Sequence, residues 1–180
     1  MAKARRTASG TWGTIVFVLI GVGLIFLAIL PIGSGPTGWP GPDLLIATTF
    51  AWVIRRPDIA PVWVVAGLFL LADFMLFRAP GLMACAMVLA SEYIRGREDL
   101  TVEVPFALEW SVASSMIACV IVGTSAVLVI FGAPAMSIGA MLVKLILTIL
   151  IYPVIVLCAR YLLGITRPGK PDEIGFGSRP

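Results

Sequence analysis

Apolar residues gather in six stretches along the chain, and short connectors rich in proline, glycine and charge separate them. Connectors such as PIGSGPTGWPGP, RRPD and GAPAMS contain the residues that end helices and form turns. The pattern therefore predicts six helices. Their expected ranges are residues 12–30, 44–54, 60–77, 81–94, 105–131 and 137–163.

The composition places these helices in a membrane. Hydrophobic residues make up 59% of the 180 positions and charged residues 13%, and the mean hydropathy is +1.03. A soluble chain of this length could not bury so much apolar surface, so the sequence predicts an all-α, polytopic membrane protein. The first stretch is longer than the apolar part of a signal peptide and no small-x-small cleavage site follows it, so we expect it to remain as the first helix.

We expect one six-helix transmembrane domain at residues 12–164. Residues 1–11 would form a cytoplasmic N-terminal segment. The proline- and glycine-rich residues 165–180 would form a flexible cytoplasmic tail.

The second stretch, Leu44–Ile54, is short for a membrane crossing. It is only eleven residues long, whereas a helix that spans a bilayer takes about 20. The positive-inside rule decides between a crossing and a dip into the bilayer. If all six stretches cross from a cytoplasmic N-terminus, eleven Lys and Arg residues lie inside and only Arg78 lies outside, with Lys144 inside a helix. If the second stretch returns to the same side, four lie inside and eight outside, so we predict that it crosses.

A short crossing helix is tolerated when neighbouring helices cover its ends, because lipid then does not have to match its length. We expect this arrangement here. Asp43 stands directly before the helix, where a carboxylate can accept hydrogen bonds from the first free N–H groups.

Four ionisable residues fall within or near the ends of the helices: Asp73, Glu92, Glu109 and Lys144. Asp73 and Lys144 lie at similar depths, which allows an ion pair that pins two helices, or else a proton or ion site; we favour the structural pair. Glu92 is expected to pair with Arg95, three residues on. Glu109 should be satisfied near the cytoplasmic face by snorkelling or by a cytoplasmic arginine.

The chain shows no pattern typical of catalysis or of a metal site. It has no histidine, and its three cysteines fall in three different apolar stretches, where we expect them to pack as small buried residues. There is no nucleophile elbow and no phosphate-binding loop, and the connectors are short. We therefore expect no enzyme activity, no cofactor and no metal. Gly21 and Gly23 in the first helix are expected to allow close helix approach.

Three motifs occur in an order that suggests a family. PGPDLLIATTFAW (residues 40–52) is followed by RRP (55–57) and then by GLFLLADFMLFRAPGL (67–82). This series resembles the rod shape-determining protein MreD family, which has a Pro-Asp-Leu-Leu opening to its second helix, a Gly-Leu-x-x-x-x-Asp stretch and a following Pro-Gly-Leu turn. The match covers about residues 40–97; the first, fifth and sixth helices agree only in character.

The resemblance implies a non-catalytic subunit of the bacterial cell-elongation machinery in the inner membrane. Such a protein would bind the bitopic protein MreC and help couple MreB filaments to the peptidoglycan synthases RodA and penicillin-binding protein 2. Membrane lipid would be a further contact, and nucleic acid would not be a partner. The family also resembles the vitamin-binding S components of ECF transporters in fold, so a small-molecule-binding S component or secondary transporter is the alternative function.

Eight residues are the candidates for fixing the fold or contacting a partner. On the resemblance, Pro42, Asp43, Gly67, Asp73 and Gly81 carry the family pattern. The other three come from the residues themselves. Arg55 and Arg56 are typical of any cytoplasmic connector, where contact with anionic lipid headgroups or a cytoplasmic partner is allowed but not required, and Lys144 is the candidate partner of Asp73.

Overall fold

The computed structural model describes residues 2–30, 40–97 and 105–163, with side chains from residue 11 to residue 161 within those ranges. The described residues form six α-helices and no strand. The helices are α1 (Ala2–Ile29), α2 (Leu44–Arg55), α3 (Val62–Met75), α4 (Leu82–Arg95), α5 (Phe106–Ile130) and α6 (Ile138–Leu163). Their bounds lie close to the predicted ones, except that α1 begins at Ala2 instead of residue 12. The predicted tail, residues 165–180, lies outside the described residues.

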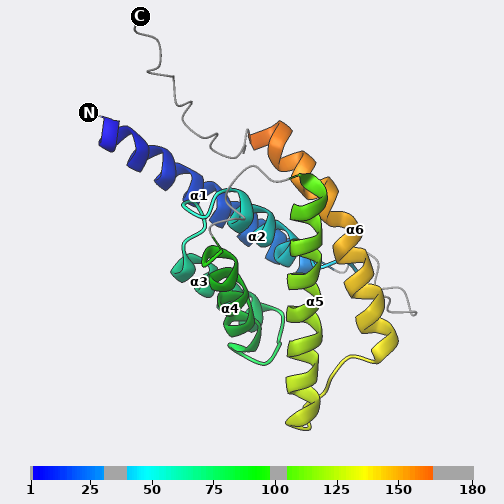
Figure 1. Ribbon diagram of the computed structural model, residues 1–180. Helices are drawn as coiled ribbons and strands as arrows, with labels where there is room; N and C mark the ends of the chain where they lie inside the picture. Colours follow the sequence, from blue (N-terminus) through cyan, green and yellow to red (C-terminus); the bar gives the residue numbers. More distant parts are fainter. Residues whose placement is uncertain (1, 31–39, 98–104, 164–180) are drawn as a thin grey trace, which may run out of the picture.

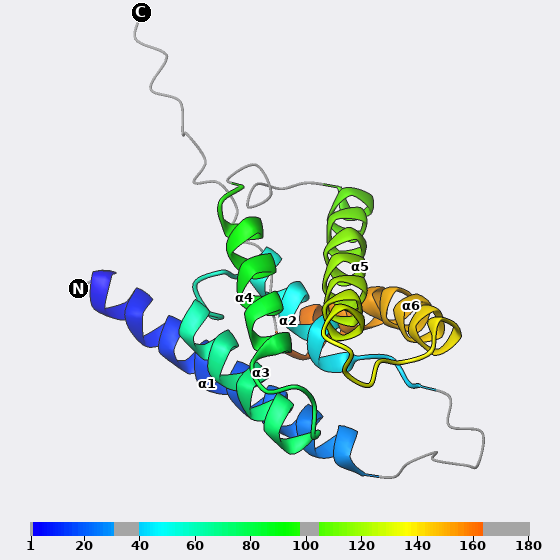
Figure 2. The ribbon, with the colours of Figure 1, turned by 90° about the horizontal axis from the view of Figure 1, so that it is seen from below.

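The helices form two antiparallel hairpins and a central element. Helices α3 and α4 make a short hairpin, and α5 and α6 make a longer one (Figure 1). Helix α1 runs alongside α3, and α2 lies between the α1–α3–α4 group and the long hairpin (Figure 2). Helix α2 contacts α1, α4, α5 and α6, so the shortest helix has the most neighbours.

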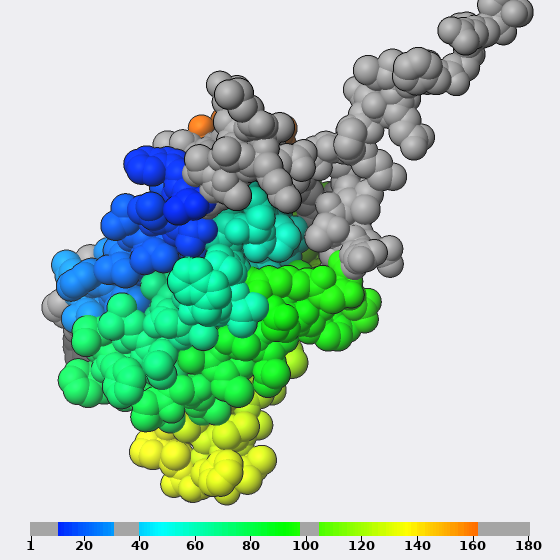
Figure 3. Space-filling view, turned by 90° about the vertical axis from the view of Figure 1, so that its left-hand side faces the viewer, coloured from blue at the N-terminus to red at the C-terminus, as the bar shows by residue number. Residues whose placement is uncertain are grey.

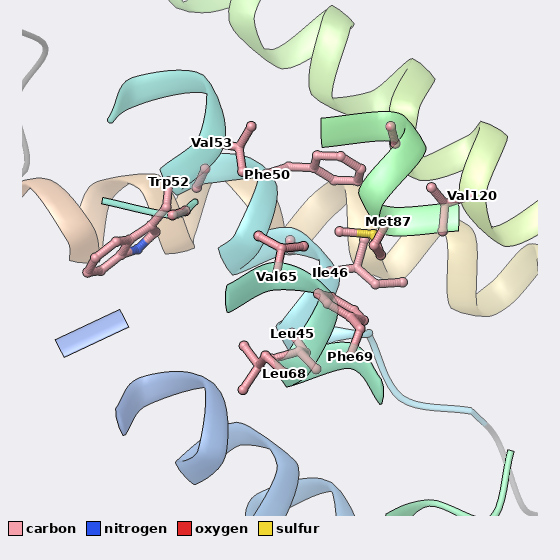
Figure 4. Packing of buried hydrophobic residues seen from close by; sticks show 14 of the residues in the cluster. Leu45, Ile46, Phe50, Trp52, Val53, Val65, Leu68, Phe69, Met87 and Val120 are labelled. Atoms are coloured by element: carbon pink, nitrogen blue, oxygen red, sulfur yellow. The ribbon is translucent and has the colours of Figure 1, made fainter. Parts of the chain in front are cut away.

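Helix α2 forms the centre of the core. All ten residues from Leu45 to Ile54 are buried, as expected for a helix that is apolar on every side. Its aromatic side chains point in different directions: Trp52 packs against Phe17 of α1 with ring centroids 5.3 Å apart, while Phe50 lies on the side of α4 (Figure 4). A helix of 12 residues is about 18 Å long, shorter than a bilayer core. Because other helices cover it, its length need not match the lipid.

Three segments are long and apolar enough to cross a membrane: Thr11–Ile29, Phe106–Ile130 and Ile138–Tyr161. Most of their side chains lie on the outside of the bundle, where large apolar residues such as Leu19 and Leu150 are exposed. This outward apolar surface is consistent with a membrane protein, in which lipid covers it. The turn between α5 and α6 projects beyond the short helices (Figure 3).

Helix α1 approaches α3 closely at one of the two predicted glycines. A Cβ atom at Gly21 would lie 2.4 Å from Cδ2 of Leu68, whereas a Cβ atom at Gly23 would meet nothing within 4 Å. Gly21 therefore allows the close contact between α1 and the Leu68 side chain of α3, and Gly23 does not take part in it.

The predicted burial of the cysteines is wrong. Cys85, Cys119 and Cys158 are all exposed, on the outer faces of α4, α5 and α6. In a helix that faces lipid on one side and the core on the other, both faces are apolar, so hydrophobicity alone does not indicate which face a cysteine occupies.

Candidate functional site

Asp43 connects three parts of the bundle at the start of α2. Its Oδ1 accepts a hydrogen bond from the N–H of Ile46 at 3.4 Å, which confirms the predicted N-cap. Its Oδ2 lies 2.7 Å from Nζ of Lys144 in α6 and 3.5 Å from Nη2 of Arg78 in the α3–α4 turn. Its own N–H donates to Oγ1 of Thr148 at 2.9 Å. We call Asp43, Asp73, Arg78 and Lys144 together the Asp43-end cluster.

Asp73 holds the start of α4. Its Oδ2 accepts hydrogen bonds from the N–H groups of Gly81 at 2.9 Å and Ala84 at 3.4 Å. Gly81 has a φ of +83°, a left-handed conformation that glycine adopts without strain. Asp73 and Gly81 thus act as one capping unit, although eight residues separate them in the chain. Capping of this kind stabilises a helix by about 1 kcal/mol.

The predicted ion pair between Asp73 and Lys144 is wrong. Lys144 pairs with Asp43, and the Asp73 carboxylate turns to the α4 backbone instead. The two residues do line the same cavity. Depth along a helix does not determine the direction in which a side chain points, and α2 supplied a nearer carboxylate.

Two cavities adjoin the Asp43-end cluster. One, of about 460 Å³, lies between the α3–α4 turn and the α5–α6 hairpin and is lined by Asp73, Arg78 and Lys144, by the hydroxyl residues Thr124 and Ser125, and by apolar residues. The other, of about 500 Å³, lies between the end of α1 and the start of α2. Arg78 and Lys144 line both, so their charges face each cavity.

A second polar cluster lies at the opposite end of α2. Arg55 pairs with Glu109 of α5 through two hydrogen bonds of 2.8 and 3.2 Å, and the hydroxyl of Tyr152 in α6 donates to Glu109 at 3.1 Å. The expected arginine partner of Glu109 is confirmed. Tyr152 was not predicted, because a tyrosine within an apolar run gives no signal beyond its need for a polar partner when buried. This cluster ties α2, α5 and α6 together.

The remaining charges at this end lie nearer the surface. Arg56 pairs with Asp58 at 3.0 and 3.1 Å, and these hydrogen bonds hold the pKa of the Asp58 carboxyl below its ordinary value despite partial burial. The predicted pair of Glu92 and Arg95 is present at 2.7 Å. Arg95 also donates to the backbone carbonyl of Ala60, which fastens α4 to the start of α3.

The other two predicted residues are not part of either cluster. Pro42 is half-buried and precedes the N-cap of α2, where it lines the second cavity. Gly67 is exposed on α3, and a Cβ atom there would meet nothing within 4 Å. Gly67 therefore has no packing role among the residues that the structure describes.

The described side chains form ion pairs and helix caps, and some of them line two cavities. Within the described ranges, no group of three His, Cys, Asp or Glu residues could hold a metal ion. Compared with protein-family models, curated proteins and solved structures, the chain matches none. Its function is therefore argued from its own residues and from the motif resemblance.

Proposed function

We propose that this chain is a non-catalytic membrane subunit of the bacterial cell-elongation complex, which binds an MreC-like bitopic protein. Through that partner it would help couple MreB filaments to RodA and penicillin-binding protein 2, and thus to cell shape. In this proposal all six helices cross the inner membrane, with both termini in the cytoplasm. The charge distribution supports this topology, and the burial of α2 accounts for a crossing helix of only 12 residues.

The observation that carries the proposal is the position of the motif residues. The two aspartates of the family pattern, Asp43 and Asp73, both cap helices, and Asp73 does so through the glycine of the Pro-Gly-Leu turn. A pattern whose members depend on one another physically is less easily explained by chance similarity of apolar sequences. This supports the resemblance as one of structure and not only of composition.

The exposed Gly67 supports a contact outside the chain. It belongs to the same motif, yet it packs against nothing within the bundle. Glycine in an exposed helix interior costs about 1 kcal/mol relative to alanine, which is offset when another helix approaches the bare backbone. We propose that the Gly67 face of α3 meets the transmembrane helix of the bitopic partner.

The test is affinity purification of the tagged chain from its native host in mild detergent, followed by identification of what accompanies it. We expect a bitopic membrane protein in near-equal amount. Gly67→Leu should reduce its recovery. Gly123→Leu on α5, where a Cβ also meets nothing within 4 Å, is the matched control and should not. Recovery of the chain alone contradicts the proposal, and equal recovery with both variants contradicts the assigned face.

The alternative function is a substrate-binding S component or a secondary transporter. The observation that favours it is the cavity of about 460 Å³, a size typical of small-molecule sites, with Asp73 and Lys144 on its wall. The same purification distinguishes the two functions. A transporter would be recovered with ATPase subunits or a bound vitamin, and would bind that ligand saturably.

A further inference from the structure

The cavity between the α3–α4 turn and the α5–α6 hairpin results from a difference in helix length. Helix α5 has 25 residues and α4 has 14, so their lengths are about 37 and 21 Å. The long hairpin therefore extends past the short one on the Asp43 side (Figure 3). Lys144 lies six residues after the start of α6, which places it about 9 Å along the helix axis from the first residue of α6.

The lipid leaflet beside the bundle has to adapt to this difference in length between the two hairpins. Where helices are short, the bilayer thins and headgroups move inward. Phe77, which lines the cavity, is 97% exposed to the leaflet, and Phe131, next to the long hairpin's turn, is 82% exposed. Phe77 also has a φ of +51°, an uncommon conformation for a bulky residue. A headgroup that moves inward beside the end of the short hairpin reaches the depth of the Asp43-end cluster.

The cavity wall presents donors on one side. Lys144 and Arg78 both share Oδ2 of Asp43, so two cations face one carboxylate. An ammonium has three N–H donors and a guanidinium has five, which leaves donors on both residues after the bonds to Asp43 are made. A phosphate fits such a pair of cations.

The cavity lining also contains an acceptor, Asp73. Asp73 is fully buried, its Oδ2 is engaged by the α4 backbone, and its Oδ1 has no hydrogen-bond partner among the described residues. A buried carboxylate oxygen without a donor is costly, and in a residue that lines a cavity it indicates a missing donor. An N–H-bearing cation is the donor that matches its charge.

We propose that this cavity binds the headgroup of an aminophospholipid from the surrounding leaflet. Its phosphate contacts Arg78 and Lys144, its primary ammonium donates to Oδ1 of Asp73, and its acyl chains lie against the apolar rim. A phosphatidylcholine headgroup has no N–H to donate, and a phosphatidylglycerol headgroup has no cation. The site therefore selects a primary amine next to a phosphate. The inference depends on the membrane setting and not on the cell-elongation proposal.

Native mass spectrometry of the full chain tests this inference. The protein is purified in detergent and supplied with equal amounts of phosphatidylethanolamine, phosphatidylglycerol and phosphatidylcholine with the same acyl chains. We expect one phosphatidylethanolamine to be retained about tenfold more than either other lipid, as loss of one charge-assisted hydrogen bond implies. Equal retention of the three lipids overturns the proposal.

Variants separate the two halves of the site. In Asp73→Asn the side-chain oxygen can still cap α4, but the other carboxylate oxygen becomes an amide NH2 group and the negative charge is lost. The preference for phosphatidylethanolamine should therefore disappear. Arg78→Gln should weaken both phosphatidylethanolamine and phosphatidylglycerol. Arg97→Gln, which loses an exposed contact to the Tyr93 ring at the opposite end of the bundle, is the matched control and should change nothing. An unchanged preference in Asp73→Asn overturns the role of Asp73.

A soluble competitor distinguishes lipid from free ligand. Phosphoethanolamine carries the same headgroup charges without acyl chains. Retained lipid that millimolar phosphoethanolamine does not displace supports the proposal. Saturable binding of phosphoethanolamine with no retained lipid overturns it and indicates a site for a soluble zwitterion, as an S component would have.

Discussion

Asp43 and Asp73 both cap helices, but their carboxylates have different surroundings. Asp43 faces two cations, whereas Asp73 faces backbone N–H groups and a cavity. Asp58 differs from both, because 54% of its side chain is exposed and its partner Arg56 is near the surface. Its lowered pKa adds stability above the ordinary carboxyl pKa, and that stability is lost as pH falls through the lowered value. Solvent screening keeps this contribution small.

Replacing Asp43 should destabilise the bundle. In Asp43→Asn the buried Lys144 loses its anionic partner, and breaking a buried pair from one side costs about 3 kcal/mol. Thermal unfolding in detergent at pH 7 measures the change. Asp58→Asn is the matched control and should cost less than about 1 kcal/mol. Similar losses in both variants would show that the Asp43–Lys144 pair contributes little.

Element bounds were predictable from the sequence, while contacts between elements were less so. Proline, glycine and charge interrupt every apolar stretch, which fixed the ends of α2 to α6 within about two residues. The N-cap at Asp43 also followed from local sequence, and an arginine was one of the two ways expected to satisfy Glu109, although Arg55 itself was not singled out. The partner of Lys144 did not, because it depends on the rotation of α6 about its axis. The cysteine positions failed for a related reason, since lipid-facing and core-facing positions are equally apolar.

Packing of α1 on α3 should depend on Gly21. In Gly21→Ala the new Cβ would lie 2.4 Å from a methyl group of Leu68, which is buried and has little room to move, so we expect a loss of about 1–2 kcal/mol in unfolding free energy. Gly23→Ala should be neutral or slightly stabilising, because alanine favours a helix and the space is open. Equal melting temperatures for both variants and the parent would contradict the close approach of α1 and α3.

At the scale of the whole molecule, polar groups gather at the two ends of α2 and apolar surface lies between them. One end carries the Asp43-end cluster and the other carries Arg55, Glu109 and Tyr152. Both clusters join α2 to α6, and each also joins a further part of the bundle. The core helix is thus fastened at both ends, which limits how the short and long hairpins can move relative to each other.

The proposed six-crossing topology would place the two ends of α2 on opposite sides of the membrane. With the three native cysteines replaced by alanine, Ala133→Cys in the α5–α6 turn should react with a membrane-impermeant maleimide in intact spheroplasts. Asp58→Cys in the α2–α3 connection should react only after permeabilisation. If the Asp58 position is labelled first, α2 does not cross as proposed.

The complete enclosure of α2 has a consequence for how the protein enters the membrane. A segment of 12 residues with Arg55 at its end gains too little from lipid to insert by itself. Its neighbours α4, α5 and α6 are all synthesised after it. During synthesis α2 should therefore remain outside the bilayer core until the later helices arrive, and chains shortened before α5 should fail to insert it. In a series of chains of increasing length, each with a glycosylation reporter, α2 should be found inserted across the membrane only once α5 and α6 are present.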